Sequence, residues 1–106
     1  MDKKTIMLVC SAGMSTRLLV GKILKAARMK KKDVEVFASS SAEFENNLAN
    51  KHLDAILLGP QARFLKESFG KMAQEKGVPL DVINMIDYGL MKGDKVLEQG
   101  LGLIKK

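Results

Sequence analysis

The sequence predicts an α/β domain in which a four-stranded parallel sheet lies between two layers of helices. Short apolar runs alternate along the chain with segments of helical periodicity, a pattern typical of right-handed βαβ units. Chain order and handedness favour the strand order 2-1-3-4, with the reversal between the first and third strands. The expected strands are residues 6–10, 34–37, 55–58 and 82–86, and the expected helices are residues 15–31, 42–51, 62–76 and 94–104.

The composition of the strands predicts their places in the sheet. Residues 55–58 are continuously apolar, as expected of a central strand that is covered on both faces. Residues 34–37 alternate between apolar and other side chains, which indicates a half-covered edge strand. In the first helix, Leu19, Ile23 and Ala26 recur at helical spacing and mark the buried side.

Local signals indicate where the helices begin and end. Ser40 and Glu43 have the spacing of a capping box, which predicts the start of the second helix. Gly77, followed by a proline two residues later, predicts the end of the third helix. Gly100 and Gly102 weaken the last helix by about 1 kcal/mol each relative to alanine, so we expect that helix to be the least stable or to pack closely through them.

Length and composition favour one domain over residues 1–106. The chain has 106 residues, 46% of them hydrophobic and 28% charged, which suits a globular protein with a single core. One cysteine allows no internal disulfide, so we expect a cytoplasmic protein. No run approaches the roughly 20 apolar residues of a membrane span, and we expect neither a signal peptide nor direct membrane insertion.

The net charge of +6 does not by itself indicate a nucleic-acid partner. The lysines are scattered over the polar sides of helical patterns, the chain has a single tyrosine, and no nucleic-acid motif is present. One cysteine and one histidine cannot build a metal site, so we expect no metal and no cofactor.

The candidate nucleophile is Cys10, at the carboxyl end of the first predicted strand. A small-residue loop and a helix follow it, so backbone N–H groups and the helix N-terminus would favour a thiolate and bind an anion. A buried structural cysteine is the alternative. The candidate phosphate-binding residues are Ser11, Ala12, Gly13, Met14, Ser15 and Thr16.

Three segments of the chain resemble one family. Residues 10–16, read as Cys-Ser-Ala-Gly-Met-Ser-Thr after an apolar strand, resemble the phosphorylation loop of the lactose/cellobiose-type IIB subunit of the bacterial sugar phosphotransferase system. The resemblance continues in residues 57–61 (Leu-Leu-Gly-Pro-Gln) and 87–91 (Asp-Tyr-Gly-Leu-Met), and so spans nearly the whole chain.

This resemblance implies a phosphocarrier in sugar uptake. In that family the cysteine, here Cys10, accepts a phosphoryl group from a phosphohistidine on a IIA partner. It then passes the group to a disaccharide, such as cellobiose or chitobiose, held by the membrane protein IIC. We expect the isolated chain to be a monomer.

A small cysteine-dependent phosphatase is a competing interpretation. Low-molecular-weight tyrosine phosphatases have a similar fold and a Cys-x5-Arg loop, whereas here Arg17 falls one residue later and Thr16 takes the place of the arginine. One residue on a helix is a rotation of about 100°, so we expect Arg17 to point away from the phosphate. A flavodoxin-like phosphate- or cofactor-binding module is the other alternative, but only 5% of the residues are aromatic.

Further candidates lie at the same predicted sheet edge. Gly59, Pro60 and Gln61 follow the third strand and either line the Cys10 loop or form an ordinary turn. Tyr88 follows the fourth strand and either contacts a partner or covers the core. His52 precedes the third strand, so we expect it at the opposite end of the sheet from Cys10.

Overall fold

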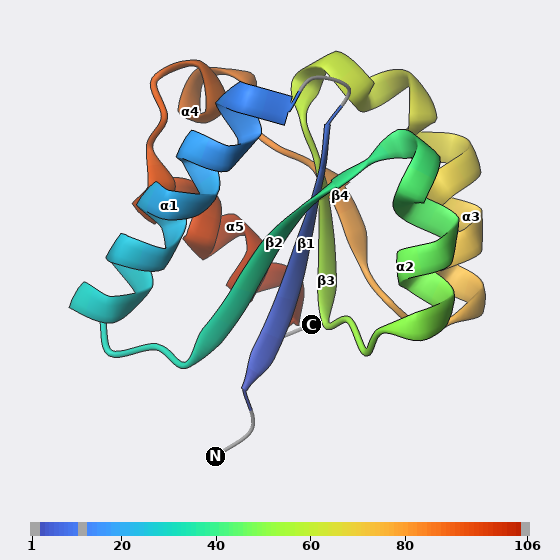
Figure 1. The fold of residues 1–106 in the computed structure, drawn as a ribbon, viewed down its shortest axis with the longest axis horizontal. Coiled ribbons are helices and arrows are strands. Elements are labelled where there is room, and N and C mark those ends of the chain that lie inside the picture. The colour runs from blue at the N-terminus through green and yellow to red at the C-terminus, as the bar shows by residue number, and fades with distance from the viewer. Residues whose placement is uncertain (1–2, 11–12, 105–106) are drawn as a thin grey trace.

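The fold is known from a computed structural model that describes residues 3–10 and 13–104, and it contains the predicted parallel sheet (Figure 1). The strand order is β2-β1-β3-β4, with every neighbouring pair parallel, so the predicted order and direction are confirmed. The strands are β1 (Lys4–Cys10), β2 (Val34–Ser40), β3 (Ala55–Leu58) and β4 (Leu80–Val82). As predicted, β2 lies at an edge with alternating burial and β3 is buried at every position.

Helices cover both faces of this sheet and form the two outer layers (Figure 1). On one face lie α1 (Gly13–Met29) and α5 (Gly93–Ile104), and on the other lie α2 (Phe44–Asn50) and α3 (Lys66–Glu75). Two 3-10 helices, η1 (Ser41–Glu43) and η2 (Pro60–Leu65), precede α2 and α3, so the predicted starts at residues 42 and 62 fall inside them. A short helix, α4 (Met85–Gly89), connects β4 to α5.

The alternation of side chains along β1 divides the core in two. Ile6, Leu8 and Cys10 pack beneath α1 and α5. Met7 and Val9 point to the opposite face and pack beneath α2 and α3. There Phe44 and Phe69 stack with their ring centroids 3.9 Å apart. Because β1 is buried on both faces, its carboxyl end is held rigidly, and Cys10 is the last residue of that end.

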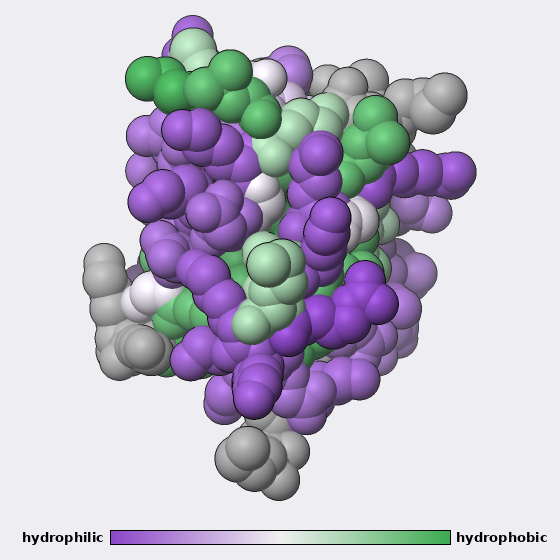
Figure 2. Space-filling model, turned by 90° about the vertical axis from the view of Figure 1, so that its left-hand side faces the viewer, coloured by the Kyte–Doolittle hydropathy of each residue, from purple (hydrophilic) through white to green (hydrophobic). Residues whose placement is uncertain are grey.

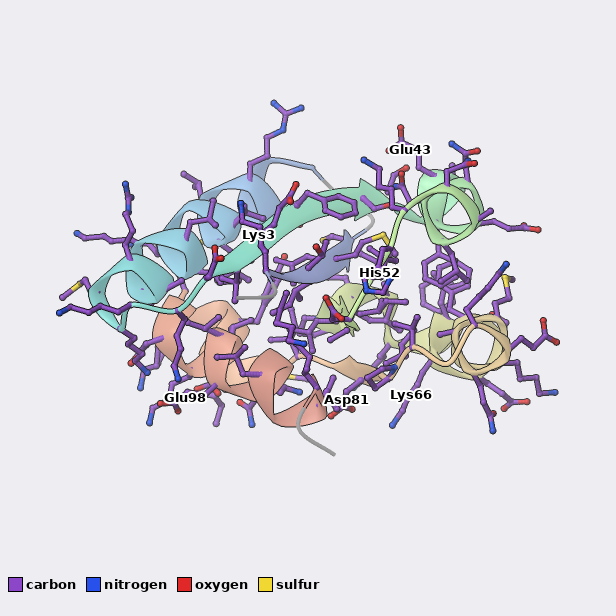
Figure 3. All side chains as sticks on the ribbon, turned by 90° about the horizontal axis from the view of Figure 1, so that it is seen from below. Lys3, Glu43, His52, Lys66, Asp81 and Glu98 are labelled. Atoms are coloured by element: carbon purple, nitrogen blue, oxygen red, sulfur yellow. The ribbon has the colours of Figure 1, made fainter. Side chains whose placement is uncertain are left out.

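Charged side chains point outward from both helical layers (Figure 3). On one side Lys30, just after the end of α1, donates to Glu98 of α5 at 2.8 Å, and this hydrogen bond lowers the pKa of Glu98. On the other, Lys66 lies 3.9 Å from Asp81 (Figure 3). Both pairs are exposed to solvent, so they contribute little to stability compared with the core.

The predicted capping signals are present in the structure. The Ser40 hydroxyl accepts a hydrogen bond from the Glu43 N–H at 3.2 Å, although it begins η1 rather than α2 directly. Gly77 has a φ of +73°, the left-handed conformation that ends a helix and favours glycine, so the predicted end of the third helix is confirmed.

The predicted extent of the fourth strand is wrong. The strand ends at Val82, and the segment expected to continue it turns into α4. Asn84 causes the change, because its side-chain oxygen accepts hydrogen bonds from the N–H groups of Ile86 at 2.9 Å and Asp87 at 3.1 Å. This is an N-cap, and it competes directly with an extended conformation.

Close packing of the last helix depends on two glycines. A Cβ on Gly93 would lie 2.5 Å from the backbone carbon of Lys22, so α5 begins in backbone contact with α1. A Cβ on Gly100 would lie 2.9 Å from the Ile6 side chain, which confirms close packing there. Gly102 has nothing within 4 Å of its Cβ position, so close packing is not the role of that residue.

Candidate functional site

Cys10 lies at the carboxyl edge of the sheet, between the ends of two other strands. It pairs with Ser40 at the end of β2, and on its other side Gly59 donates its N–H to the carbonyl of Val9 at 2.8 Å. The Cys10 side chain is only 5% exposed and forms no disulfide. The predicted reversal point between β1 and β3 is therefore where the thiol sits.

Two side chains from distant parts of the chain lie beside the Cys10 sulfur. The Tyr88 hydroxyl oxygen lies 3.4 Å from Sγ, and the Gln61 Oε1 atom lies 4.0 Å from it. A Cβ on Gly59 would lie 3.4 Å from Sγ and 3.2 Å from Gln61 Oε1, so glycine leaves room for both groups. Residues 59–61 therefore both turn the chain into η2 and line the cysteine.

Tyr88 is a buried neighbour of the thiol rather than an exposed residue. Its side chain is 8% exposed and belongs to the same core cluster as Cys10. Burial raises the pKa of Tyr88, and the contact with Cys10 raises it further, whereas interactions with the Thr16 and Gln61 side chains lower it in part. A phenol with a raised pKa stays protonated at neutral pH and is available as a hydrogen-bond donor.

The candidate phosphate loop is described only in part. Ser11 and Ala12 lie outside the described residues, as do the side chains of Met14 and Ser15. The backbone of Gly13, Met14 and Ser15 forms the first turn of α1, where N–H groups have no acceptor within the helix. Thr16 is 2% exposed and interacts with Tyr88. Phosphate binding by this loop stays a prediction.

A small hollow of about 210 Å³ opens in front of the cysteine. Arg17 is exposed and lines it from α1. Sequence reasoning missed its other wall, because the second strand extends three residues beyond its predicted end and reaches Cys10. The polar ends of parallel strands meet at one edge, which is the signal that could have found this wall. The hollow is lined by Cys10, Thr16, Arg17, Ala38, Ser39, Ser40 and Glu43.

Glu43 is the one acidic residue that lines this hollow in the described part of the chain. Its carboxylate accepts a hydrogen bond from the Ser40 hydroxyl at 3.2 Å, so it is tied to the helix cap. Arg17 lines the same hollow, so charges of both signs are present near the cysteine.

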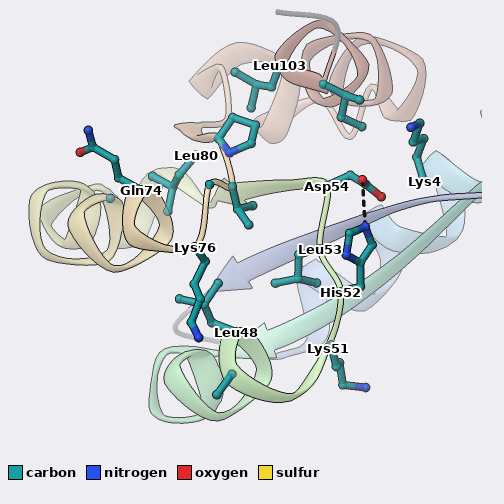
Figure 4. Close-up of a pocket in the computed structure, with 16 residues that line it drawn as sticks. Lys4, Leu48, Lys51, His52, Leu53, Asp54, Gln74, Lys76, Leu80 and Leu103 are labelled. Atoms are coloured by element: carbon teal, nitrogen blue, oxygen red, sulfur yellow. Dashed lines mark ion pairs between the residues drawn. The ribbon is translucent and has the colours of Figure 1, made fainter.

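His52 lies at the opposite end of the sheet, as predicted. It precedes β3, its side chain is 86% exposed, and its Nε2 lies 3.4 Å from an oxygen of Asp54 (Figure 4). The Asp54 carboxylate also accepts the N–H of Thr5 at 2.8 Å. His52 lines a groove of about 870 Å³ at the amino ends of the strands, away from Cys10 (Figure 4).

Large exposed apolar side chains surround the Cys10 edge. In the described residues five of the six such side chains lie within eight residues after the carboxyl end of a strand, and the sixth, Met29, lies at the far end of α1. Figure 2 shows apolar side chains at the end of the molecule where α4 and the start of α1 lie, above a hydrophilic flank. We call this group the apolar rim: Leu18, Phe64, Met85, Ile86 and Leu90.

Comparison with known proteins places this arrangement in a family. Residues 5–99 match the family model described as PTS system, Lactose/Cellobiose specific IIB subunit. The chain is 53% identical over 100 residues to the galactose-specific EIIB component of Lactococcus lactis subsp. cremoris, covering 92% of this chain and 93% of that protein. It is equally similar to the cellobiose-specific EIIB component of Lactococcus lactis subsp. lactis, with 53% identity and the same coverage.

A solved structure agrees with these relatives. The solution structure of the cellobiose-specific phosphotransferase IIB component from Borrelia burgdorferi superimposes with a TM-score of 0.79 at 36% identity. The match covers 98% of this chain and 94% of that one. Since sequence and fold agree over almost the whole length, the chain belongs to the lactose/cellobiose-specific IIB subunits of the phosphotransferase system.

Proposed function

We propose that Cys10 is the residue that carries the phosphoryl group in this phosphotransferase component. It accepts the group from a phosphohistidine on a IIA partner and passes it to a disaccharide bound by IIC. The observation that supports this assignment most directly is the position of the thiol. The only cysteine of the chain lies at the reversal point of the sheet, beside a small hollow and next to the N-terminal turn of α1.

The surroundings of Cys10 suit transfer from a phosphohistidine. The thiol loses its proton, the sulfur attacks phosphorus, and an S–P bond forms as the N–P bond breaks. The bonding electron pair stays on the imidazole nitrogen, which takes up a proton. Backbone N–H groups of residues 11–16 are the proposed donors to the phosphoryl oxygens. Hydroxyl groups of Ser11, Ser15 and Thr16 would supplement them.

The second transfer releases the thiolate. A sugar hydroxyl oxygen attacks phosphorus and the S–P bond breaks, leaving the electron pair on Cys10. The proton of the sugar hydroxyl is released. A bidentate arginine is needed by a phosphatase but not by a carrier, and Arg17 stands one residue outside the phosphatase register. The proposed carrier therefore holds the phosphoryl group against water until the acceptor arrives.

The apolar rim supports docking of partners at the Cys10 edge. Both transfers require a partner to come within bonding distance of the buried sulfur, so both partners must cover the surface around it. Exposed apolar side chains concentrated on one surface are typical of protein-binding sites. We assign the rim to the IIA donor and propose that Arg17 contributes to this surface.

The sugar, the location and the assembly state follow from the family as proposals. The two Lactococcus relatives are equally similar to this chain, yet one is named for galactose and the other for cellobiose. Because the sugar binds IIC, we propose a β-linked disaccharide of the cellobiose or chitobiose kind and no more specific identity. In the described residues no helix is both long and apolar enough to cross a membrane. We propose that residues 1–106 form one cytoplasmic, monomeric domain.

Intact-mass measurement tests the role of Cys10. The protein is incubated with a phosphorylated IIA partner, and one added phosphoryl group is expected on the wild type and none on Cys10→Ser. Serine is the control of similar shape, and its hydroxyl is far less ionised than a thiol. A phosphoryl group on His52, or rapid hydrolysis of an aryl phosphate that Cys10→Ser abolishes, would overturn the proposal.

A further inference from the structure

One polar partner of the Cys10 sulfur comes from the other end of the chain. The Tyr88 hydroxyl lies 3.4 Å from Sγ, and both side chains are buried. Seventy-eight residues separate them in sequence, and the N-cap at Asn84 sets the start of the short helix that carries Tyr88. A contact of this length between a hydroxyl and a sulfur is a hydrogen bond, with either atom able to donate.

The state of the sulfur decides which atom donates. A thiolate and a phosphorylated sulfur carry no proton, so in both states the Tyr88 phenol at 3.4 Å is the donor of this hydrogen bond. Burial and the contact with Cys10 raise the pKa of Tyr88, so the phenol keeps its proton at neutral pH.

We propose that Tyr88 is a catalytic residue whose hydroxyl donates to the Cys10 sulfur and sets how readily that sulfur releases the phosphoryl group. The inference rests on the proposed role of Cys10. A thiolate carries a full negative charge and accepts a strong hydrogen bond. The bridging sulfur of a phosphocysteine carries much less charge. The same donor therefore stabilises the state after release more than the phosphorylated state.

The consequence for the reaction cycle is directional. When the S–P bond breaks, its electron pair stays on sulfur. The Tyr88 hydroxyl donates a hydrogen bond to the sulfur and stabilises its developing negative charge. The transfer of the phosphoryl group from phosphohistidine to Cys10 becomes less favourable by the same factor, because the hydrogen bond stabilises the thiolate and the thiolate is a reactant in that step. Tyr88 thus balances the two transfers, so that the carrier is loaded by one partner and still gives up the group to the next.

The composition of the chain makes the test unusually clean. Cys10 is the only cysteine and Tyr88 the only tyrosine, so alkylation reports on one thiol and tyrosinate absorbance on one phenol. The first variant is Tyr88→Phe, which keeps the buried ring and removes the hydroxyl. The second sample is wild-type sequence with ring-fluorinated tyrosine, a more acidic phenol and a stronger donor at the same position.

The pH profile of iodoacetamide alkylation is the first readout. In Tyr88→Phe we expect the midpoint to move up by about one pH unit, since a hydrogen bond to an ionised group is worth one to two such units. Fluorinated tyrosine should move the midpoint down. Arg17 and Glu43 are the charged groups lining the hollow, so Arg17→Gln and Glu43→Gln profiles measure their separate contributions.

The phosphoryl-exchange equilibrium with the IIA partner is the second readout. Tyr88→Phe should shift it about tenfold toward phosphocysteine, the same factor as one pH unit in the thiol. Thermal unfolding of each sample shows whether the fold is retained. Unchanged alkylation in both samples, or equal slowing of both directions without a shift in equilibrium, would overturn the proposal. Failure of Cys10 to take a phosphoryl group at all would instead overturn the proposed function, while the alkylation profiles would still report the hydrogen bond.

Discussion

The Tyr88 and Gln61 groups that lie beside the Cys10 sulfur carry no formal charge. A phenol lies at 3.4 Å and an amide oxygen at 4.0 Å, and a glycine stands where a larger side chain would crowd both. Neutral hydrogen-bonding groups at these two contacts allow the same atom to exist as a thiolate and as a phosphothioester. A carboxylate in contact with the sulfur would penalise both forms, because each is negatively charged.

Gln61→Glu tests this requirement with a side chain of nearly the same shape. A charge about 4 Å from the sulfur interacts by roughly 1 to 4 kcal/mol, depending on how far solvent screens it. Since Gln61 is exposed and Cys10 is buried, we expect an intermediate value. The alkylation midpoint of Cys10 should rise, and the rate of phosphorylation should fall at least tenfold.

Gln61→Ala is the control for this change, because it removes the amide without adding charge. Its phosphorylation rate should stay within a few-fold of the wild type. Wild-type phosphorylation of Gln61→Glu would show that the neutrality of this contact is incidental.

At the scale of secondary-structure elements, the arrangement of α1 and α5 holds the face of the sheet that contains the thiol. Gly93 allows the start of α5 to touch the backbone of α1 at Lys22, and Lys30, just after α1, donates to Glu98 in the middle of α5. The pair lies over Ile6 and Leu8 of the strand that ends at Cys10. The distance between α1 and α5 therefore influences how tightly the two helices pack over the end of β1 that carries Cys10.

Gly93→Ala should destabilise the protein by about 1–3 kcal/mol, the usual cost of overpacking. A Cβ there would lie 2.5 Å from backbone rather than from a movable side chain, so the helices must separate. Urea unfolding followed by circular dichroism measures the change.

Gly102→Ala is the matched control in the same helix. Its Cβ would meet nothing within 4 Å, so the substitution should stabilise the helix by roughly 0.5–1 kcal/mol through propensity alone. Similar effects of the two substitutions would contradict the packing explanation.

At the scale of the whole molecule, the two ends of the sheet differ in character. The carboxyl end has the cysteine and the apolar rim, whereas the amino end has the large groove with Lys51, His52 and Lys76 along it. The proposed chemistry uses only the carboxyl end. A substitution of an exposed residue at the carboxyl end should therefore change the rate of phosphoryl transfer, and one at the amino end should not.

Ile86→Glu and Met29→Glu make the same change of charge and polarity at two exposed apolar positions. Ile86 is 67% exposed in the rim, and Met29 is 76% exposed at the far end of α1. We expect Ile86→Glu to raise the KM for the phosphorylated IIA partner about tenfold with little change in kcat, because docking weakens while the thiol is unaltered.

Met29→Glu should leave both constants near the wild-type values. Neither substitution should lower the thermal unfolding temperature much, since both side chains are exposed. Equal effects of the two on KM would show that the rim is not a docking surface.

The sequence alone predicted the sheet order, the buried central strand and the end of the third helix. Each depends on a local pattern: continuous apolar residues at 55–58, alternation at 34–37, and a glycine followed by a proline after residue 76. The prediction from sequence was wrong at residues 83–86, where apolar side chains indicated a strand. The Asn84 side chain caps two backbone N–H groups and starts a helix there instead.

What the sequence by itself determined is the position of the thiol and the family. A single cysteine after an apolar run, with small residues behind it, identifies the end of a strand and the mouth of a loop wherever the rest of the chain goes. The motifs at residues 57–61 and 87–91 extend that resemblance along the chain. Both signals are local, and local signals can be read directly from the order of residues.

Only the tertiary structure decided what surrounds the sulfur. Tyr88 and Gln61 reach Cys10 from 78 and 51 residues away, and the sequence left open whether Tyr88 faces a partner or the core. The answer depends on where β4 ends and how α4 turns, which the Asn84 cap and packing under α1 and α5 determine. Contacts of this range arise from the combined packing of several elements, so no pattern within one segment records them.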